Sequence, residues 1–180
     1  MFGLINKAIV ELIKTRYGED RWREVLELAG VPDEPFLSME RYPDELSFKL
    51  VHAASNHLQI DAEEILQAFG RYWMLYTAER GYGELLKAHG DNLPEFLSRL
   101  NTLHTRVQLC LPHLVPPNIT VEDETAHSLT VHYRSERRGL TPLAHGILEG
   151  LGARFGLDLQ ILVDRKEVSS GEHTVFRIRW

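Results

Sequence analysis

With 180 residues, a formal net charge of −6 and a pI of about 5.8, the chain suits one domain large enough to enclose a ligand, and it is a poor candidate for nucleic-acid binding. Its single cysteine, Cys110, excludes an intramolecular disulfide and a cysteine-rich zinc site. We see no signal peptide and no apolar run long enough to cross a membrane, so we expect a cytoplasmic protein without a membrane partner.

The first two thirds of the chain have the apolar periodicity of helices. The predicted helices cover residues 3–16, 19–29 and 43–57, and a proline-containing loop covers residues 33–43. Asp61 is expected to cap a fourth helix that ends near Glu79. Gly81 and Gly83 are expected to interrupt the helical path before a short helix over residues 84–89.

The next predicted helix carries a histidine on its apolar stripe. Asn92 caps this helix, which ends before Pro112 and places His104 beside Leu100 and Val107. A lone histidine at such a position is usually a core residue. Because no cysteine or carboxylate stands at metal-ligand spacing on that face, His104 suits a single axial ligand, as in a haem site, and not part of a zinc cage.

Pro116 and Pro117 mark a change of architecture. The predicted elements that follow are strands over residues 118–124 and 128–134, a helix over 140–155, and strands over 157–165 and 174–180. We therefore expect an α+β fold in a single domain over residues 1–180. In it, a helical part (residues 1–112) packs on an antiparallel sheet of ββαββ order (residues 113–180).

The second predicted strand carries three hydrogen-bond donors on one face. If residues 129–137 are extended, Tyr133, Ser135 and Arg137 point the same way. A phenol, a hydroxyl and a guanidinium suit an anionic ligand with more than one carboxylate. The alternative is the ordinary polar face of an edge strand, which is common. Together with His104, the donors suggest haem, with iron bound from one side and propionates held at the edge.

The whole chain resembles the H-NOX family, haem domains that bind nitric oxide or oxygen and are related to the sensor domain of soluble guanylate cyclase. The matching segments are residues 1–8, 68–73, 81–86, 93–97, 103–107, Pro116-Pro117 and Tyr133-x-Ser135-x-Arg137. The last motif is weak alone. It becomes highly specific with His104 at this spacing and the other segments in order.

The resemblance implies haem b (iron protoporphyrin IX) buried between the two parts. His104 would be the proximal iron ligand, Pro117 would press on the porphyrin, and Ile5 would pack against the macrocycle. The propionates would be bound by Tyr133, Ser135 and Arg137. The distal pocket would be lined by Trp73, Leu143 and Ile147.

The distal side decides which gas binds. Oxygen-binding members of the family use a distal tyrosine whose hydroxyl donates to bound O₂. Residues 139–159 contain no tyrosine, so we expect a selective sensor of nitric oxide that also takes CO. Tyr72, Tyr76 and His145 are donors that the sequence leaves open, besides the indole of Trp73.

The family also implies a signalling mechanism. Nitric oxide weakens or breaks the iron–histidine bond, which releases strain between the haem, His104 and Pro117 and shifts the helical part relative to the ββαββ part. We expect no catalytic activity and a separate effector, such as a histidine kinase or a cyclic-di-nucleotide enzyme. The alternatives are an O₂-binding haem protein, a haem enzyme such as a peroxidase that would use His145, and a cofactor-free interaction module.

Overall fold

The computed structural model describes residues 1–166 and 168–180, with the backbone alone at residues 77–82. The helices are α1 (Gly3–Tyr17), α2 (Glu19–Ala29), α3 (Asp44–Leu58), α4 (Ala62–Tyr72), the π-helix η1 (Trp73–Thr77), α5 (Ala78–Lys87), α6 (Leu93–Ser98), α7 (Leu100–Cys110) and α8 (Thr141–Arg154). The strands are β1 (Asn118–Glu122), β2 (Ser128–Ser135), β3 (Gln160–Lys166) and β4 (Glu172–Arg179). The predicted α+β fold with ββαββ order is confirmed.

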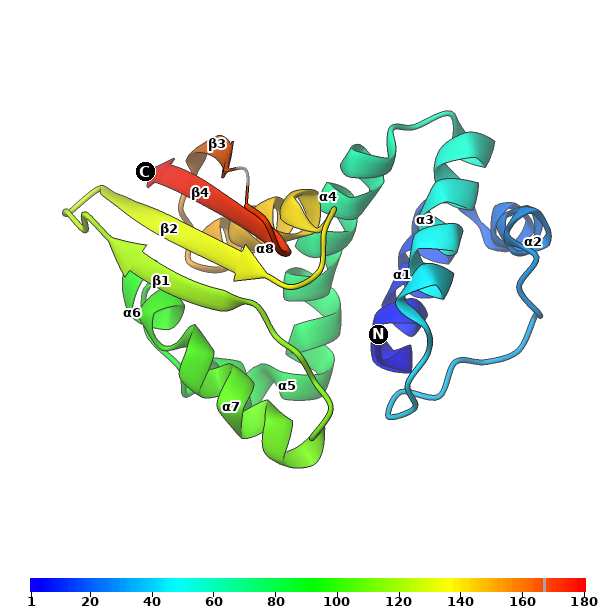
Figure 1. Cartoon of the computed structure of the whole chain (residues 1–180), viewed down its shortest axis with the longest axis horizontal. Helices are drawn as coiled ribbons and strands as arrows, with labels where there is room; N and C mark the ends of the chain where they lie inside the picture. The colour runs from blue at the N-terminus through cyan, green and yellow to red at the C-terminus, as the bar shows by residue number, and fades with distance from the viewer. Residues whose placement is uncertain (167) are drawn as a thin grey trace.

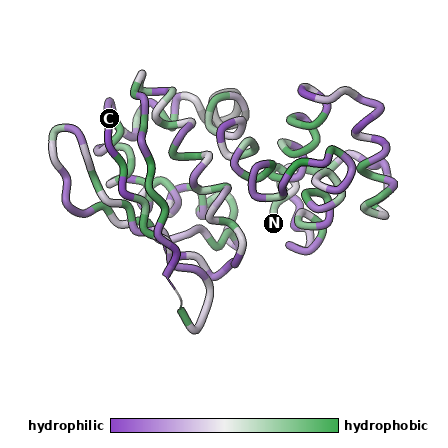
Figure 2. The backbone as a smooth tube through the Cα atoms, turned by 90° about the horizontal axis from the view of Figure 1, so that it is seen from above, coloured by the Kyte–Doolittle hydropathy of each residue, from purple (hydrophilic) through white to green (hydrophobic). Residues whose placement is uncertain are grey.

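The N-terminal helices form a group of their own. Their apolar stripes meet in one core, in which Ile13, Trp22 and Leu50 are almost fully buried. Helix α4 runs between this group and the sheet, as Figure 1 shows. Seen from above, the N-terminal helices and the part of the chain that carries the sheet lie side by side (Figure 2). The region between them is therefore bounded by elements from both ends of the chain.

The sheet is antiparallel, with the strand order β1-β2-β4-β3. Alternation along β2 determines its faces, because Leu129, Val131 and Tyr133 are buried while the residues between them are more exposed. Tyr133 lies opposite Ile119 on β1 and opposite Thr174 on β4. The buried face packs against α6, α7 and α8 in a second core.

Two of the expected helix boundaries are wrong. The backbone continues from α4 through η1 into α5, so Gly81 and Gly83 do not interrupt it and the predicted short helix is the end of α5. Glycine weakens a helix without forbidding one. Conversely, the single helix predicted after Asn92 is divided at Arg99 into α6 and α7. The predicted cap itself is present, because Oδ1 of Asn92 accepts the Glu95 N–H at 2.9 Å.

Glycines bring α8 into backbone contact with α4. A Cβ atom on Gly146 would lie 1.9 Å from the carbonyl oxygen of Gln67, and one on Gly70 would lie 2.3 Å from that of Leu143. Only residues without a side chain permit this approach. The contact fixes the position of α8 relative to η1, which follows α4 directly.

Candidate functional site

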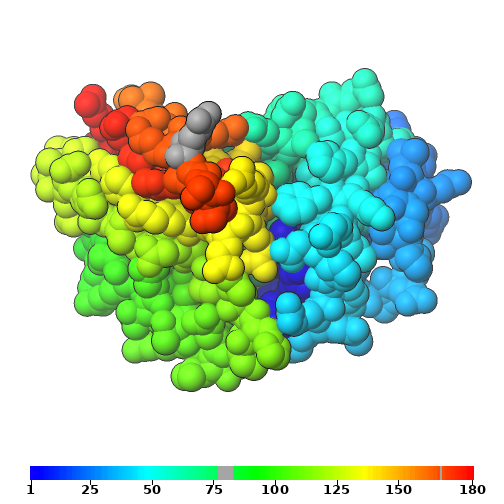
Figure 3. Space-filling view, viewed as in Figure 1, coloured from blue at the N-terminus to red at the C-terminus, as the bar shows by residue number. Residues whose placement is uncertain are grey.

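A cavity of about 350 Å³ lies between the N-terminal helices and the part of the chain that carries the sheet. In Figure 3 the surface is hollowed between these parts, and N-terminal residues (blue) are visible in the hollow. The cavity wall is mostly apolar, as in sites for small molecules and cofactors. All of the predicted site residues line it: Ile5, Trp73, His104, Pro117, Tyr133, Ser135, Arg137, Leu143 and Ile147.

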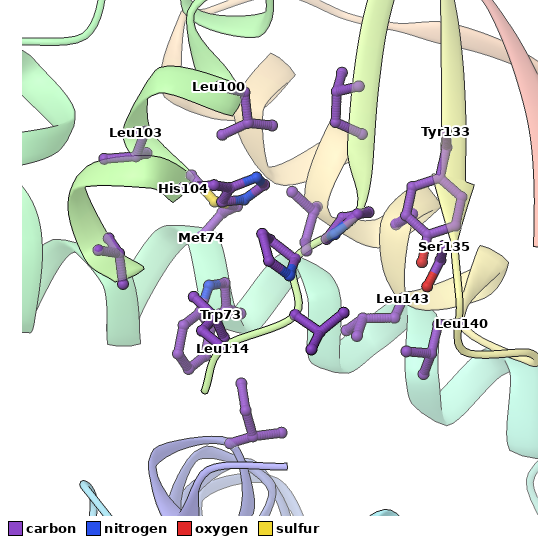
Figure 4. Close-up of a pocket in the computed structure, with 18 of the residues that line it drawn as sticks. Trp73, Met74, Leu100, Leu103, His104, Leu114, Tyr133, Ser135, Leu140 and Leu143 are labelled. Carbon is purple, nitrogen blue, oxygen red and sulfur yellow. The ribbon is translucent and has the colours of Figure 1, made fainter. Parts of the chain in front are cut away.

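His104 projects from α7 into this cavity (Figure 4). Its Nδ1 is buried and has no hydrogen-bond partner among the described residues. Burial lowers the pKa of His104 to about 4, although the nearby backbone carbonyl of Pro117, a hydrogen-bond acceptor, acts in the opposite direction. The ring is therefore neutral near pH 7, which is the form that binds metals. The neutral ring therefore remains available to a ligand inside the cavity.

Two polar side chains attach α7 to the segment around Pro117. Asn101, one turn before His104, donates from Nδ2 to the Ile119 carbonyl at 2.7 Å and accepts the Ile119 N–H on Oδ1 at 3.0 Å. Gln108, one turn after His104, donates from Nε2 to the Leu114 carbonyl at 2.9 Å. No sequence signal pointed to this arrangement of Asn101 and Gln108, which we call the α7 clamp. It holds His104 at a fixed place relative to the proline segment.

The donor face of β2 opens into the same cavity. Burial raises the pKa of Tyr133 to about 12, with a smaller opposing effect from Ser135, so its phenol stays protonated. Ser135 also lines the cavity, and its Oγ accepts the backbone N–H of Arg137 at 3.0 Å. Strand β2 ends at Ser135, so Arg137 lies in the following loop and not on the extended strand predicted for it. Its side chain reaches the cavity nevertheless.

The guanidinium of Arg137 is already engaged on one side. Its Nε donates to Oδ2 of Asp44 at 2.5 Å, and its Nη1 donates to the Val115 carbonyl at 2.7 Å. Asp44 also pairs with the terminal ammonium of Met1. Burial alone would raise the pKa of Asp44, but hydrogen bonds and charges from Met1 and Arg137 outweigh this effect and lower it. No sequence signal identified Asp44, because its partner is 93 residues away.

The wall formed by η1 and α8 is apolar. Of the four donors considered from the sequence, only Trp73 lines the cavity. The Tyr72 and Tyr76 rings pack on each other with centroids 5.0 Å apart. His145 lies near Phe176 and Glu149. Trp73 opens the π-helix η1, a distortion that occurs often at functional sites.

The geometry suits a large apolar ligand that contains one metal ion and carries carboxylates. One histidine nitrogen is available inside, and hydroxyl and guanidinium donors stand at one part of the wall. Among the described residues, no group of three or more His, Cys, Asp or Glu could hold a metal ion by itself. In the same part of the chain, no helix has the length and apolar character needed to cross a membrane. The residues therefore fit a haem held by one axial ligand.

Comparisons with known proteins agree with this geometry. A family model described as "Haem-NO-binding" matches residues 2–163. The soluble guanylate cyclase gcy-31 of Caenorhabditis elegans is 30% identical over 100% of the chain and 26% of its own length. The chain thus spans about a quarter of that relative.

Solved structures show the same fold. An oxygen-binding H-NOX domain in its oxygen complex superposes with a TM-score of 0.83 at 20% identity, covering 99% of this chain and 94% of that one. An H-NOX protein from S. oneidensis in the Fe(II)NO state gives 0.85 at 22% identity, covering 99% and 98%. Because structures described with different gases share the fold, the fold alone does not select the gas.

Proposed function

Because the chain belongs to the haem-NO-binding family, the H-NOX domains, we propose that it is a selective sensor of nitric oxide that signals to a separate effector. The domain binds haem and is a haem-based gas sensor of the soluble guanylate cyclase type. H-NOX domains are sensor domains without catalytic activity of their own. The selectivity, the residue roles and the effector are the proposed parts.

The residues that line the cavity have distinct roles in holding the haem. His104 would bind the iron through its neutral ring. The phenol of Tyr133, the hydroxyl of Ser135 and the guanidinium of Arg137 would bind the propionates. The protonated phenol is a donor at any physiological pH, and Arg137 keeps N–H groups beyond those bound to Asp44 and Val115. When bound, the haem supplies a ferrous iron that coordinates diatomic gases.

The position of Pro117 in the cavity wall supports a role in shaping the cofactor. Pro117 follows Pro116 in the loop between α7 and β1, and both line the cavity. Its ring is rigid, and the α7 clamp holds both ends of this segment against the helix of His104. We infer that Pro117 presses on the porphyrin from the side of His104, while Ile5 of α1 packs against the macrocycle.

The proposal of nitric oxide selectivity rests on the apolar wall formed by η1 and α8. Bound O₂ is strongly polarised and gains from a hydrogen-bond donor, whereas bound nitric oxide depends on one much less. Tyr72, Tyr76 and His145 do not line the cavity, and Leu143 and Ile147 present only hydrocarbon there. Of the four donors considered for this wall, the indole of Trp73 is the one that lines the cavity. We therefore expect weak or no O₂ binding, with CO as a further ligand.

His104 would hold the iron, and a displacement of its ring when a gas binds is the proposed trigger. The α7 clamp joins the helix to the proline segment both before and after His104. A displacement of the His104 ring would therefore move α7 and Pro117 together. Arg137 connects the opposite part of the cavity to α3 through Asp44. The N-terminal helices would then shift relative to the sheet, in a two-state equilibrium biased by the gas. A separate signalling protein, such as a histidine kinase or a cyclic-di-nucleotide enzyme, would read the change.

Replacing the proposed iron ligand tests the assignment. The His104→Gly variant removes the imidazole but leaves space for a free one. Its reduced haem spectrum is expected to differ from that of the parent protein and to return when imidazole is added. Thr102→Ala, an exposed neighbour on α7, is the control and should keep the parent spectrum. An unchanged spectrum in His104→Gly would exclude His104 from this role.

A second variant tests whether a hydrogen-bond donor in the cavity wall affects which gas binds. Trp73→Phe removes the indole N–H and keeps an aromatic wall. If Trp73 is a wall only, the affinities for nitric oxide and O₂ in this variant match those of the parent. A loss of O₂ binding in Trp73→Phe would instead show that the indole serves as a donor, and would favour an O₂-binding function.

A further inference from the structure

Two histidines meet on the face of the sheet that points away from α8. His132 of β2 lies opposite Val175 of β4, and His173 of β4 lies opposite Arg134 of β2, so the histidines are diagonal neighbours. Nδ1 of His132 is 3.1 Å from Nε2 of His173. The ring centroids are 5.4 Å apart and the planes are tilted by 37°. Neither histidine lines the cavity, so the pair is separate from the haem site.

We propose that His132 and His173 bind a divalent transition-metal ion of the class of Zn²⁺, Ni²⁺ or Cu²⁺, with water completing its coordination. Imidazole nitrogens bind Zn²⁺ at about 2.0–2.1 Å, which places two neighbouring ligands roughly 3 Å from each other. The separation of 3.1 Å between the ring nitrogens matches this requirement. The same two nitrogens now share a hydrogen bond, which the ion would replace once both rings turn their lone pairs toward it.

Glu122 completes an arrangement that is typical of histidine metal ligands. Its Oε2 lies 3.2 Å from Nε2 of His132, the nitrogen that faces away from His173. Metal-bound histidines usually donate their second N–H to a carboxylate, which orients the ring and makes it a better ligand. With the proton of His132 on Nε2, its Nδ1 lone pair points at the proposed ion. His173 then moves its own proton to Nδ1 and binds through Nε2, so no net proton is released.

The charges around the pair affect both the protonation of His173 and the binding of a cation. Burial lowers the pKa of His173, and nearby cationic groups lower it further, which keeps its ring neutral. Two of these cations have other partners: Arg134 donates to Thr120 at 3.2 Å, and Lys166 pairs with Asp164 at 2.5 Å. Their charges still oppose a bound cation. Because its ligands are imidazoles, the site suits Zn²⁺, Ni²⁺ or Cu²⁺ and not Ca²⁺ or Mg²⁺, which require oxygen ligands.

Zn²⁺ titration of the haem-loaded protein tests the proposal. Calorimetry at pH 7.5 is expected to show a binding event that is lost in His132→Asn and in His173→Asn. Glu122→Gln should weaken it by about 10–100-fold, the usual effect of removing a carboxylate behind a ligand. His127→Asn changes an exposed histidine in the β1–β2 turn and should bind Zn²⁺ as the parent does. The haem spectrum should stay constant throughout, which separates this test from that of the gas sensor.

If a variant fails to fold, a measurement on the parent protein still tests the proposal. Substoichiometric Cu²⁺ should broaden the NMR signals of the His132 and His173 rings first, before those of the other histidines. The proposal is overturned if both histidine variants fold and bind Zn²⁺ as the parent does. It is also overturned if Cu²⁺ broadens other histidines first.

Discussion

Nε of Arg137 lies 2.5 Å from Oδ2 of Asp44 and so joins the loop after β2 to the first turn of α3. The same carboxylate binds the terminal ammonium of Met1. Arg137 is also the residue that we assign to the propionates. One guanidinium would therefore contact the cofactor and the N-terminal helices together, which would give the proposed gas signal a direct route between the two parts of the domain.

Removal of the carboxylate should loosen this connection. Asp44→Asn leaves Arg137 and the Met1 ammonium without their shared anion, and we expect a loss of about 1–2 kcal/mol in the free energy of unfolding. Urea titration of the haem-loaded protein measures it. Glu19→Gln, which disrupts the exposed pair with Lys14, is the control and should cost less than about 0.5 kcal/mol. Equal effects of the two substitutions would contradict a special role for Asp44.

The same pair predicts a dependence of stability on pH. The folded pKa of Asp44 is lowered because contacts with Met1 and Arg137 outweigh the opposing effect of burial. Its contribution is then present above the unfolded pKa of about 3.9 and is lost as the pH falls through the folded pKa. The parent and Asp44→Asn should therefore differ in unfolding free energy at pH 7 and converge in strong acid. A difference that stays constant from pH 7 to pH 2 would argue against this linkage.

The α7 clamp should govern how His104 is held. Asn101→Leu leaves the Ile119 N–H and carbonyl without their side-chain partner, and we expect faster amide hydrogen exchange in α7 and at Ile119. The loosened helix should also raise the five-coordinate fraction of the nitric oxide complex, seen in its absorbance spectrum. Thr102→Ala, an exposed neighbour on α7, serves as the control. A variant with faster exchange but an unchanged spectrum would reduce the clamp to a purely structural role.

Gly146 should not tolerate a side chain. The Cβ of alanine would lie 1.9 Å from the Gln67 carbonyl oxygen, so α8 must move away from α4. We expect Gly146→Ala to lower the free energy of unfolding by about 1–3 kcal/mol, the usual cost of overpacking. Because Leu143 and Ile147 move with α8, the rate of CO rebinding should change as well. Ala153→Ser, at an exposed position of α8, should affect neither measurement.

A phenol in the apolar wall should alter gas selectivity. Leu143→Tyr places a hydroxyl among the cavity-lining residues of α8, where the parent has only hydrocarbon. We expect this variant to gain measurable O₂ binding and to keep nitric oxide binding. Leu143→Phe adds a ring without the hydroxyl and separates the effect of size from that of the donor. If both variants bind O₂ equally, hydrogen bonding does not determine the selectivity.

Local patterns predicted the parts of the structure that depend on local chemistry. The apolar period located most helices, and alternation along β2 placed Tyr133 and Ser135 on the side of the cavity. Periodicity does not show which faces of the elements meet. That the predicted site residues share one cavity could therefore be predicted only from the resemblance. The continuity of the helix through Gly81 and Gly83 was not predictable, because glycine lowers helix stability without fixing a boundary.

Contacts between distant segments could not be found in the same way. Asp44 stands in the first turn of α3, where an acidic residue needs no further explanation. His132 and His173 are ordinary residues of an exposed strand face until the register of β2 and β4 makes them neighbours. Gly146 gave no sign of its contact with Gln67. In each case the partner is set by tertiary packing and leaves no mark on the local sequence.

The absorbance spectrum of the reduced, haem-loaded protein tests the central claim most directly. The ferrous protein is recorded without gas, then in air, and then after air is replaced by nitric oxide. We predict no stable oxygen complex in air and a nitric oxide complex in which the bond to His104 is weakened or broken. A stable oxygen complex in air would contradict the account.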